Sequence, residues 1–198
     1  MQNVNNSNNN PSVSTPSFAV DVEKVILVTH DDNPIGEGWK LETHRKGLLH
    51  RAFSIFIFNA KGEMLLQRRA LSKYHSPGLW TNACCSHPRP AEETKEAALR
   101  RLQEEMGFTT DIHKVFDFVY KAEFDNGLTE FEFDHVFVGE YSDEIHFNTE
   151  EVEEYCYQSI SEIKNAIQAN PENFTVWFRI AFPKVEQWWL NHKKDSIT

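Results

Sequence analysis

The sequence predicts an α+β sandwich, in which helices form a layer on each side of a mixed central sheet. Two observations predict this class: segments with strand character outnumber those with helical character, and the helices are interleaved among the strands. The 198 residues suffice for one domain with a sizeable core. Because 40% of them are hydrophobic, including 15 Phe, the chain has ample bulky material to fill that core.

Residues 1–17 differ in composition from the rest of the chain. They are rich in Asn, Ser and Pro and almost free of large apolar side chains, which predicts a disordered tail. Order is expected to begin near Phe18. No internal repeat or later linker is apparent, so residues 18–198 are expected to form a single domain.

The first part of this domain is predicted to consist mainly of strands. Residues 24–29 form a short β-branched run that predicts a strand, followed by a turn at 30–34. Residues 36–47 show little periodicity and predict a loop that carries His44. Residues 51–58 are apolar on both faces and predict a buried strand, and a hairpin turn at 59–62 leads to a returning strand at 64–68.

Residues 92–106 predict a helix, because Ala98, Leu102 and Met106 recur at a spacing of four and form an apolar stripe. Gly107 is expected to end it. A capping box from Ser159 to Glu162 predicts the start of a second helix. A last, aromatic helix is expected at about 174–191, bent or divided by the proline at position 183.

Two further strands are predicted at residues 115–122 and 130–140, joined by a turn at 125–127. The period of two along the second strand separates its side chains into two faces. One face carries Phe131, Phe133, His135 and Phe137, and the other carries Glu130, Glu132 and Asp134. The acidic face is notable, although an acidic pair on a strand is usually just solvated.

The bulk properties exclude several function classes. A net charge of −10 argues against a general nucleic-acid binder, while a few local Lys and Arg side chains can still hold an anionic substrate. The cysteines at 84, 85 and 156 are odd in number and include an adjacent pair, which argues against a disulfide framework and favours a reducing cytoplasm. No apolar run reaches membrane-spanning length, and the first basic residue is Lys24, so neither a secretory nor a transit leader is expected.

Residues 81–88, Thr-Asn-Ala-Cys-Cys-Ser-His-Pro, carry the strongest chemical signal. They place the thiol of Cys85 two residues before the imidazole of His87, between a Pro-Gly-Leu-Trp turn and the acidic helix at 92–106. A thiol beside a possible metal ligand favours a proton-transfer site. The alternative for Cys85 is a small buried hydrophobic residue.

The helix at 92–106 resembles the Nudix box, Gly-x5-Glu-x7-Arg-Glu-apolar-x-Glu-Glu-x-Gly-apolar. It retains Glu92, Arg100, Glu104, Glu105 and Gly107. It departs from the box in having Ser86 for the first Gly and Arg101 for the Glu that follows the Arg. The resemblance implies a Nudix-like α/β/α fold, and the departures count against diphosphate hydrolysis. The alternative is a solvated helix in which Arg101 and Glu105 pair at a spacing of four.

Three further motifs, Ala-Leu-Ser-Lys at 70–73, Pro-Gly-Leu-Trp-Thr-Asn at 77–82 and Cys-x-His-Pro at 85–88, resemble type 1 isopentenyl-diphosphate isomerases. This family is a branch of the Nudix fold with a degenerate box, and the resemblance runs from about residue 25 to 177. It implies interconversion of isopentenyl and dimethylallyl diphosphate through a tertiary carbocation. A proton is added on one face of the carbon skeleton and another is removed from the opposite face.

The resemblance also implies the residues of the site. Three imidazoles and two carboxylates would hold one divalent ion (Mg²⁺, Mn²⁺ or Zn²⁺) in an octahedral site: His44, His50, His87, Glu130 and Glu132. Glu105 would hold a second Mg²⁺ that also contacts the substrate diphosphate. Taken singly, each histidine would more often be a surface or hydrogen-bonded residue, and Asp134 has no implied role.

The same resemblance implies the catalytic and substrate-binding groups. Cys85 and Glu132 would be the acid and base on opposite walls, with Tyr120 assisting Glu132, while Cys84 packs away from the site. Four cations would bind the diphosphate: Lys40, Arg69, Lys73 and Arg101. Trp177 would line the hydrocarbon pocket and stabilise the cation. Which of Cys85 and Glu132 is the acid is left open.

Two other functions remain as alternatives: a Nudix hydrolase that cleaves nucleoside diphosphate derivatives, and a silent Nudix-fold module that binds a metabolite or protein. The isomerase is expected to act on a small-molecule diphosphate, without nucleic acid or membrane, as a monomer or weak homodimer.

Overall fold

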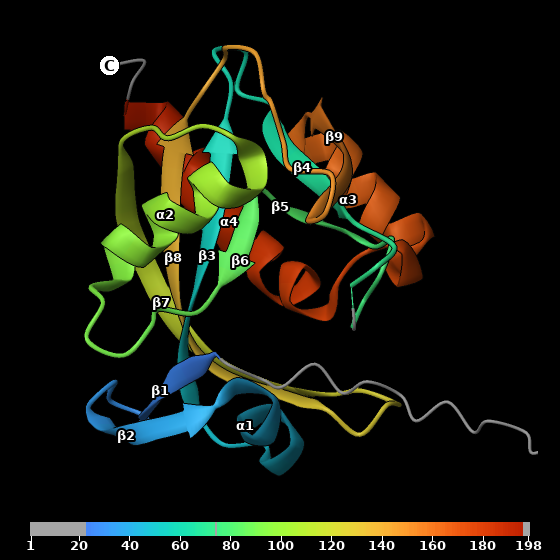
Figure 1. The fold of residues 1–198 in the computed structure, drawn as a ribbon. Coiled ribbons are helices and arrows are strands. Elements are labelled where there is room, and N and C mark those ends of the chain that lie inside the picture. Colours follow the sequence, from blue (N-terminus) through green and yellow to red (C-terminus); the bar gives the residue numbers. More distant parts are fainter. Residues whose placement is uncertain (1–22, 74, 196–198) are drawn as a thin grey trace, which may run out of the picture.

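The computed structural model describes residues 23–73 and 75–195. The predicted tail at residues 1–17 and the expected start of order near Phe18 lie outside this part of the chain. The described residues form a mixed, strongly curled nine-stranded sheet with helices on both sides (Figure 1). The predicted α+β sandwich with a mixed central sheet is therefore confirmed.

The centre of the sheet is β3 (His50–Phe58), which pairs in parallel with β8 (Thr129–Glu140) over its whole length. The other pairings between strands of the described residues are antiparallel. The remaining strands are β1 (Lys24–Val28), β2 (Pro34–Trp39), β4 (Met64–Arg69), β5 (Trp80–Asn82), β6 (Cys84–Ser86), β7 (Ile112–Glu123) and β9 (Val152–Gln158). β2, β1, β3, β4 and β5 follow one another, β6 and β8 also pair with β3, β7 pairs with β8, and β9 pairs with β4.

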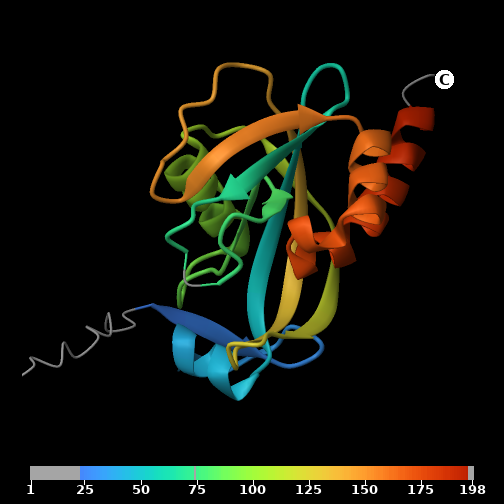
Figure 2. The ribbon, with the colours of Figure 1, turned by 90° about the vertical axis from the view of Figure 1, so that its right-hand side faces the viewer.

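The helices form the two outer layers. Figure 2 shows α2 (Thr94–Met106) on one side of the sheet and α3 (Ile160–Ala169) and α4 (Val176–Asp195) on the other. A short 3₁₀ turn, Pro171–Asn173, links α3 to α4. The small helix α1 (Lys40–Lys46) lies with β1 and β2 at the end of the sheet where β7 and β8 turn (Figure 1).

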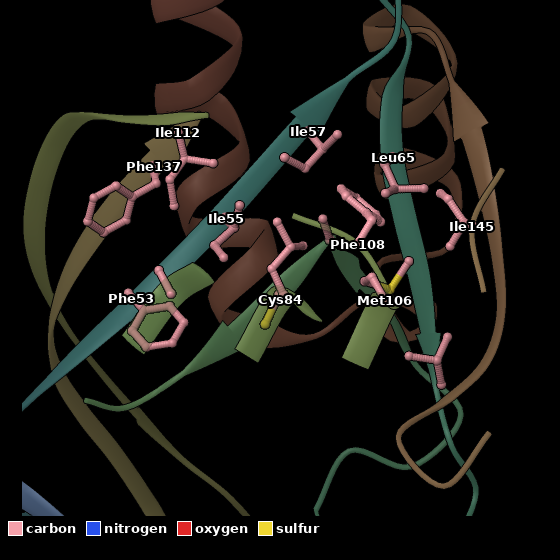
Figure 3. Packing of buried hydrophobic residues seen from close by; sticks show 14 of the residues in the cluster. Phe53, Ile55, Ile57, Leu65, Cys84, Met106, Phe108, Ile112, Phe137 and Ile145 are labelled. Carbon is pink, nitrogen blue, oxygen red and sulfur yellow. The ribbon is translucent and has the colours of Figure 1, made fainter. Parts of the chain in front are cut away.

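The alternation of side chains along β3 builds two cores. Phe53, Ile55 and Ile57 face α2 and pack with Cys84, Met106 and Phe137 (Figure 3). Phe56 and Phe58 point to the other side and pack against the aromatic face of α4. Because both faces of this strand are buried, its sequence is almost continuously apolar, as predicted for residues 51–58.

Most predicted elements are present with shifted ends. The helix predicted from Glu92 begins at Thr94 and ends at Gly107, whose φ of 77° gives the left-handed cap that glycine favours. The capping box at Ser159 and Glu162 forms in both directions and opens α3. The strands predicted at 115–122 and 130–140 are longer in the structure, as β7 and β8.

The prediction of a loop at residues 36–47 was wrong, because this segment contains β2 and α1. β2 has two glycines, and its apolar residues are exposed, so no buried apolar face marks it as a strand. It forms because a tight turn folds it back onto β1. α1 buries only Thr43 and His44, which is too little to produce a visible helical period. Gly47 ends it with φ 57°.

The last helix is not divided at Pro183, because α4 continues through it to Asp195. Apolar residues on both sides of the proline, Phe178, Phe182 and Val185, are buried against the sheet and hold the helix together. The strands β5, β6 and β9 had not been predicted. The first two have only three residues each, and β9 carries Glu153 and Glu154 on an edge that pairs with β4.

Candidate active site

The strand pairings bring the predicted site residues together. His50 of β3 lies directly opposite Glu132 of β8, and Tyr120 of β7 lies opposite the same glutamate on its other side. Ser54 of β3 lies opposite Cys85 of β6. A single region of the sheet therefore gathers residues from distant parts of the sequence.

Three histidines and two glutamates form one compact group: His44, His50, His87, Glu130 and Glu132. Their ligand atoms all lie within 4.8 Å of one another, and four of these residues are buried. The Nε2 atoms of His50 and His87 are 3.1 Å apart, His87 Nε2 lies 2.8 Å from Glu132 Oε1, and His44 Nε2 lies 3.0 Å from Glu130 Oε2. This group has the composition of a site for a divalent cation.

The hydrogen bonds of the histidines support metal binding. His44 Nδ1 donates to the carbonyl of Lys40 at 2.6 Å, and His50 Nδ1 donates to the carbonyl of Leu48 at 2.8 Å. When Nδ1 carries the proton in this way, the lone pair of Nε2 is left facing the group, as in histidines that bind a metal. His44 Nε2 and Glu130 Oε2 are both buried and lie 3.0 Å apart, but neither makes a well-aligned hydrogen bond among the described residues. These donors fit a divalent cation.

The charges in this group perturb one another strongly. Burial raises the pKa of Glu130, and the neighbouring Glu132 raises it further. Burial also acts to raise the pKa of Glu132, but the neighbouring imidazoles of His50 and His87 outweigh it and hold that pKa well below the usual range. Burial lowers the pKa of His87 to about 3. The Glu132 carboxylate is therefore ionised near neutral pH, whereas burial disfavours the ionised form of Glu130.

A cavity of about 270 Å³ lies beside this group. Its lining includes most of the residues predicted to bind or act on a substrate: Lys40, Arg69, Lys73, Cys85, His87, Arg101, Glu105, Tyr120, Glu130, Glu132 and Trp177. His44 and His50 do not line it, because they are buried behind Glu130 and Glu132. The predicted acid, base, cations and aromatic residue thus share one cavity.

The adjacent cysteines have different surroundings. Cys84 is fully buried in the core beneath α2, as predicted for it (Figure 3). Cys85 faces the cavity, and its Sγ donates to Asn82 Oδ1 at 3.0 Å and lies 3.4 Å from Ser54 Oγ. Burial, together with the nearby Asp134, raises the pKa of the Cys85 thiol far above its usual value.

Tyr120 and Trp177 complete the lining on the side of the cavity away from α2. Tyr120 Oη donates to Glu132 Oε2 at 2.5 Å, and burial raises its pKa well above the usual value. Trp177, near the start of α4, is 5% exposed, and its Nε1 donates to Thr81 Oγ1 at 2.9 Å. The guanidinium of Arg69 lies 5.4 Å from the centre of its indole.

The four predicted diphosphate cations all line the cavity, and three of them pair with carboxylates. Lys40 contacts Glu23 at 2.9 Å, Lys73 pairs with Glu151, and Arg101 donates to Glu105 at 2.6 Å. The Arg101–Glu105 pair at a spacing of four thus forms, but it is turned into the cavity and not solvated. Glu105 is buried and also accepts from Gln67 Nε2 at 2.9 Å.

Several polar residues of the site had not been predicted. His75 lines the cavity with its ring 5.7 Å from that of Trp177, and burial lowers its pKa to about 2. Asp134, to which no role had been assigned, accepts from Ser54 Oγ at 2.7 Å, and Ser54 in turn neighbours Cys85. Asn82 contacts the thiol because the short strands β5 and β6 follow each other closely, which no sequence pattern indicates.

Comparison with known proteins identifies the family. A NUDIX domain model matches residues 48–178. A protein of Serratia proteamaculans named isopentenyl-diphosphate Delta-isomerase is 51% identical over 156 residues, which cover 79% of this chain and 87% of the relative. The chain belongs to the isopentenyl-diphosphate Delta-isomerase family of NUDIX-domain proteins.

A second member of the isopentenyl-diphosphate Delta-isomerase family is isopentenyl-diphosphate Delta-isomerase 2 of Photorhabdus laumondii. It is 47% identical over 171 residues, which cover 84% of this chain and 97% of that protein. Among solved structures, the MutT protein of Methanosarcina mazei matches with a TM-score of 0.58 at 23% identity, over 70% of this chain and 94% of that one. This likeness supports the NUDIX fold. In the described part of this chain, no helix is long and apolar enough to span a bilayer.

Proposed function

We propose that this protein converts isopentenyl diphosphate into dimethylallyl diphosphate by moving a carbon–carbon double bond. The observation that carries the proposal is the shared cavity, in which Cys85 and Glu132 accompany a His/Glu group and a set of cations. The names of its relatives at 47% and 51% identity agree with this activity.

The reaction needs two proton-transfer groups, because one carbon gains a proton and another loses one. We assign these roles to Cys85 and Glu132, which come from β6 and β8 and line the same cavity. Tyr120 donates to Glu132 at 2.5 Å, so it holds that carboxylate in place and assists its proton exchange. The thiol of Cys85 is neutral at rest, since burial disfavours the thiolate.

Protonation of an alkene produces a tertiary carbocation, which the cavity must stabilise and shield from water. The indole of Trp177 is buried in the lining and supplies a π face, a contact worth about 2 kcal/mol when desolvated. Lys40, Arg69, Lys73 and Arg101 are assigned to the diphosphate. Arg69 has no carboxylate partner among the described residues, which leaves its charge available to an anion.

We assign the five-residue His/Glu group to one divalent ion, Mg²⁺, Mn²⁺ or Zn²⁺, and Glu105 to a second Mg²⁺ shared with the diphosphate. When bound, these ions supply positive charge that stabilises the Glu132 carboxylate and neutralises the diphosphate. The buried glutamates of the group have no Lys or Arg partner among the described residues, so a cation would offset the cost of burying them.

Proton NMR of isopentenyl diphosphate incubated with the protein and Mg²⁺ in heavy water tests the proposed activity. The expected result is the appearance of dimethylallyl diphosphate carrying deuterium from the solvent. Phosphate release from a panel of nucleoside diphosphate derivatives is measured in parallel. Phosphate release without isomerisation would instead favour a NUDIX hydrolase, and tight binding without turnover would favour a silent binding module.

Residues 18–198 are proposed to act as one catalytic domain, with residues 1–17 as a tail outside it. We further propose that the protein works in the cytoplasm as a monomer or weak homodimer, without nucleic acid or membrane. Its net charge of −10 agrees with the absence of a nucleic-acid partner.

A further inference from the structure

A buried chain of hydrogen bonds connects the aromatic residue of the cavity to the cysteine. It runs from Trp177 on α4 through Thr81 and Asn82, which are adjacent on β5, to Cys85 on β6. Thr81 is 1% exposed and Asn82 is fully buried. Neither residue lines the cavity, so both act only through the side chains that they contact.

The amide of Asn82 has a single possible orientation. Its Nδ2 donates to two backbone carbonyls, those of Ile55 at 3.0 Å and Cys84 at 2.9 Å. Both amide hydrogens are thereby used, and a flipped amide would place its oxygen against these two acceptors. Oδ1 therefore must face Cys85, where it accepts from Sγ at 3.0 Å.

The direction of the remaining bonds follows from Trp177, whose indole nitrogen is only a donor. Thr81 Oγ1 accepts from Trp177 Nε1 at 2.9 Å and from Thr175 Oγ1 at 3.0 Å. Its own hydrogen is then available to Asn82 Oδ1, which lies 3.0 Å away. Every side-chain donor in this series of hydrogen bonds is paired, which is the condition under which a buried polar network makes its surroundings rigid.

We propose that Asn82 is a positioning residue for Cys85, and that Thr81 couples it to Trp177, so that thiol and indole keep a fixed relative position across the cavity. The proposal rests on the proposed function, in which these two groups act on one hydrocarbon. A proton-transfer group and a cation-stabilising face must meet the same carbon skeleton with little positional error, and β5, which carries both Thr81 and Asn82, is a rigid support for the two contacts.

The other neighbour of the thiol does not provide the same restraint. Ser54 Oγ lies 3.4 Å from Cys85 Sγ and already donates to Asp134 Oδ2 at 2.7 Å. The contact with Asn82 is shorter, and it is the one that continues to Trp177. Loss of the Thr81 hydroxyl would break this connection without removing a contact of the four cations assigned to the diphosphate.

The test compares Thr81→Val with Thr81→Ser and with Thr175→Val. Thr81→Val keeps the shape of the side chain but removes the hydroxyl that joins Trp177 to Asn82, and Thr81→Ser restores it. Thr175→Val is the matched control, since it removes an equally buried hydroxyl bonded to Thr81 but leaves the connection intact. The Cys85 S–H stretch, isolated as an infrared difference against Cys85→Ala, is recorded for each variant and for Asn82→Ala.

We expect Thr81→Val to lower kcat about 100-fold with little change in KM, as for a small displacement of a reacting group. Thr81→Ser and Thr175→Val should remain near wild type. The S–H band should be displaced in Thr81→Val, and in Asn82→Ala it should move to the higher frequency of an unbonded thiol. Equal kcat losses in Thr81→Val and Thr175→Val, or an unmoved band in Thr81→Val, would overturn the proposal.

These measurements separate the inference from the proposed function. Should Asn82→Ala not fold, Thr81→Val and its control still provide both readouts. Retained turnover in Cys85→Ala would remove the proposed role of the thiol, whereas the S–H band reports the contact with Asn82 regardless of activity. An unmoved band together with an inactive Cys85→Ala variant would leave the isomerase proposal standing and reject the positioning role.

Discussion

At the scale of single residues, the proposed role of Tyr120 in assisting Glu132 depends on a single hydrogen bond. Tyr120 lies opposite Glu132 in the β7–β8 pairing, and its hydroxyl donates to that carboxylate at 2.5 Å. Its aromatic ring packs in the core on the α4 side, so the hydroxyl and the ring serve separate purposes.

Tyr120→Phe is therefore expected to lower turnover by about 100-fold, the lower end of the range for an assisted proton transfer, while the fold is retained. The measurement is the initial rate of isomerisation together with the far-ultraviolet circular dichroism of the variant. Tyr157→Phe is the matched control, because it removes a comparable hydrogen bond, to the carbonyl of Tyr141 at 2.8 Å, away from the cavity. Equal rates for the two variants would exclude a specific role for Tyr120.

The residue scale also shows what the sequence can reveal about a site. The family resemblance assigned Cys85 to the site and Cys84 to packing, and in the structure the two side chains diverge because alternation along β6 sends neighbours to opposite faces. The contacts of Asn82 and Ser54 with the thiol could not be predicted, since they depend on the pairing of β6 with β3 and on the closeness of two short strands.

At the scale of elements, the end of α2 lies close against the backbone at His146. Gly107 ends the helix with φ 77°, and a Cβ at this position would lie 2.0 Å from the carbonyl oxygen of His146. The clash involves backbone, so it cannot be relieved by a rotation of a side chain.

Gly107→Ala should consequently lower the free energy of unfolding by about 3 kcal/mol, at the upper end of the usual range for single substitutions. Chemical denaturation of the variant measures this. Gly127→Ala provides the control, since Gly127 has φ 78° but open space around it, and only the backbone cost of roughly 1 kcal/mol applies. Similar losses in both variants would show that the contact with His146 is unimportant.

The start of α2 is held by an ion pair that should depend on pH. Glu92 accepts from Arg100 at 2.7 and 2.8 Å, and this contact lowers the pKa of the Glu92 carboxyl. A carboxyl whose pKa is lower in the folded state adds stability above its unfolded pKa of about 4.3 and loses it as the pH falls through the folded value.

We expect Glu92→Gln to reduce the free energy of unfolding by about 1 kcal/mol near neutral pH. The difference from wild type should shrink as the pH is lowered below about 4. Urea denaturation of both proteins between neutral and acid pH measures it. A difference that stays constant or grows on acidification would contradict the ion pair as its cause.

Elements with a strong pattern could be predicted from the sequence and weakly patterned ones could not. The strand β3 is a nearly continuous apolar run, and the helix α2 carries apolar residues at a spacing of four, so both patterns are clear in the sequence. β2 and α1 have almost no buried apolar face, and their positions depend on pairing with β1 and on contacts with β8. The loop predicted at residues 36–47 was wrong for this reason, although it correctly contained His44.

At the scale of the whole molecule, the His/Glu group joins elements that are far apart in sequence. Its members come from α1, β3, β8 and the segment after β6, so a bound ion would connect α1 and the segment after β6 to the central sheet. A ligand that binds only the folded state raises its stability in proportion to the logarithm of the ligand concentration.

Removal of divalent ions with a chelator should therefore lower the melting temperature, and Mn²⁺ or Zn²⁺ should restore it. At a free concentration 100 times Kd the gain is about 2.7 kcal/mol. Differential scanning calorimetry of the metal-free and reloaded protein measures it, with Glu132→Gln as a variant expected to gain much less. A melting temperature that does not respond to either ion would contradict a metal site at this group.

The most direct test of the whole account follows deuterium into the product with both proton-transfer groups intact and with each removed. Wild type, Cys85→Ala and Glu132→Gln are incubated with isopentenyl diphosphate and Mg²⁺ in heavy water and followed by proton NMR. The account predicts deuterated dimethylallyl diphosphate from wild type only, while Cys85→Ala keeps its fold and its metal content. Sustained conversion by either variant would contradict the assignment of the cavity between Cys85 and Glu132 as the place where the double bond moves.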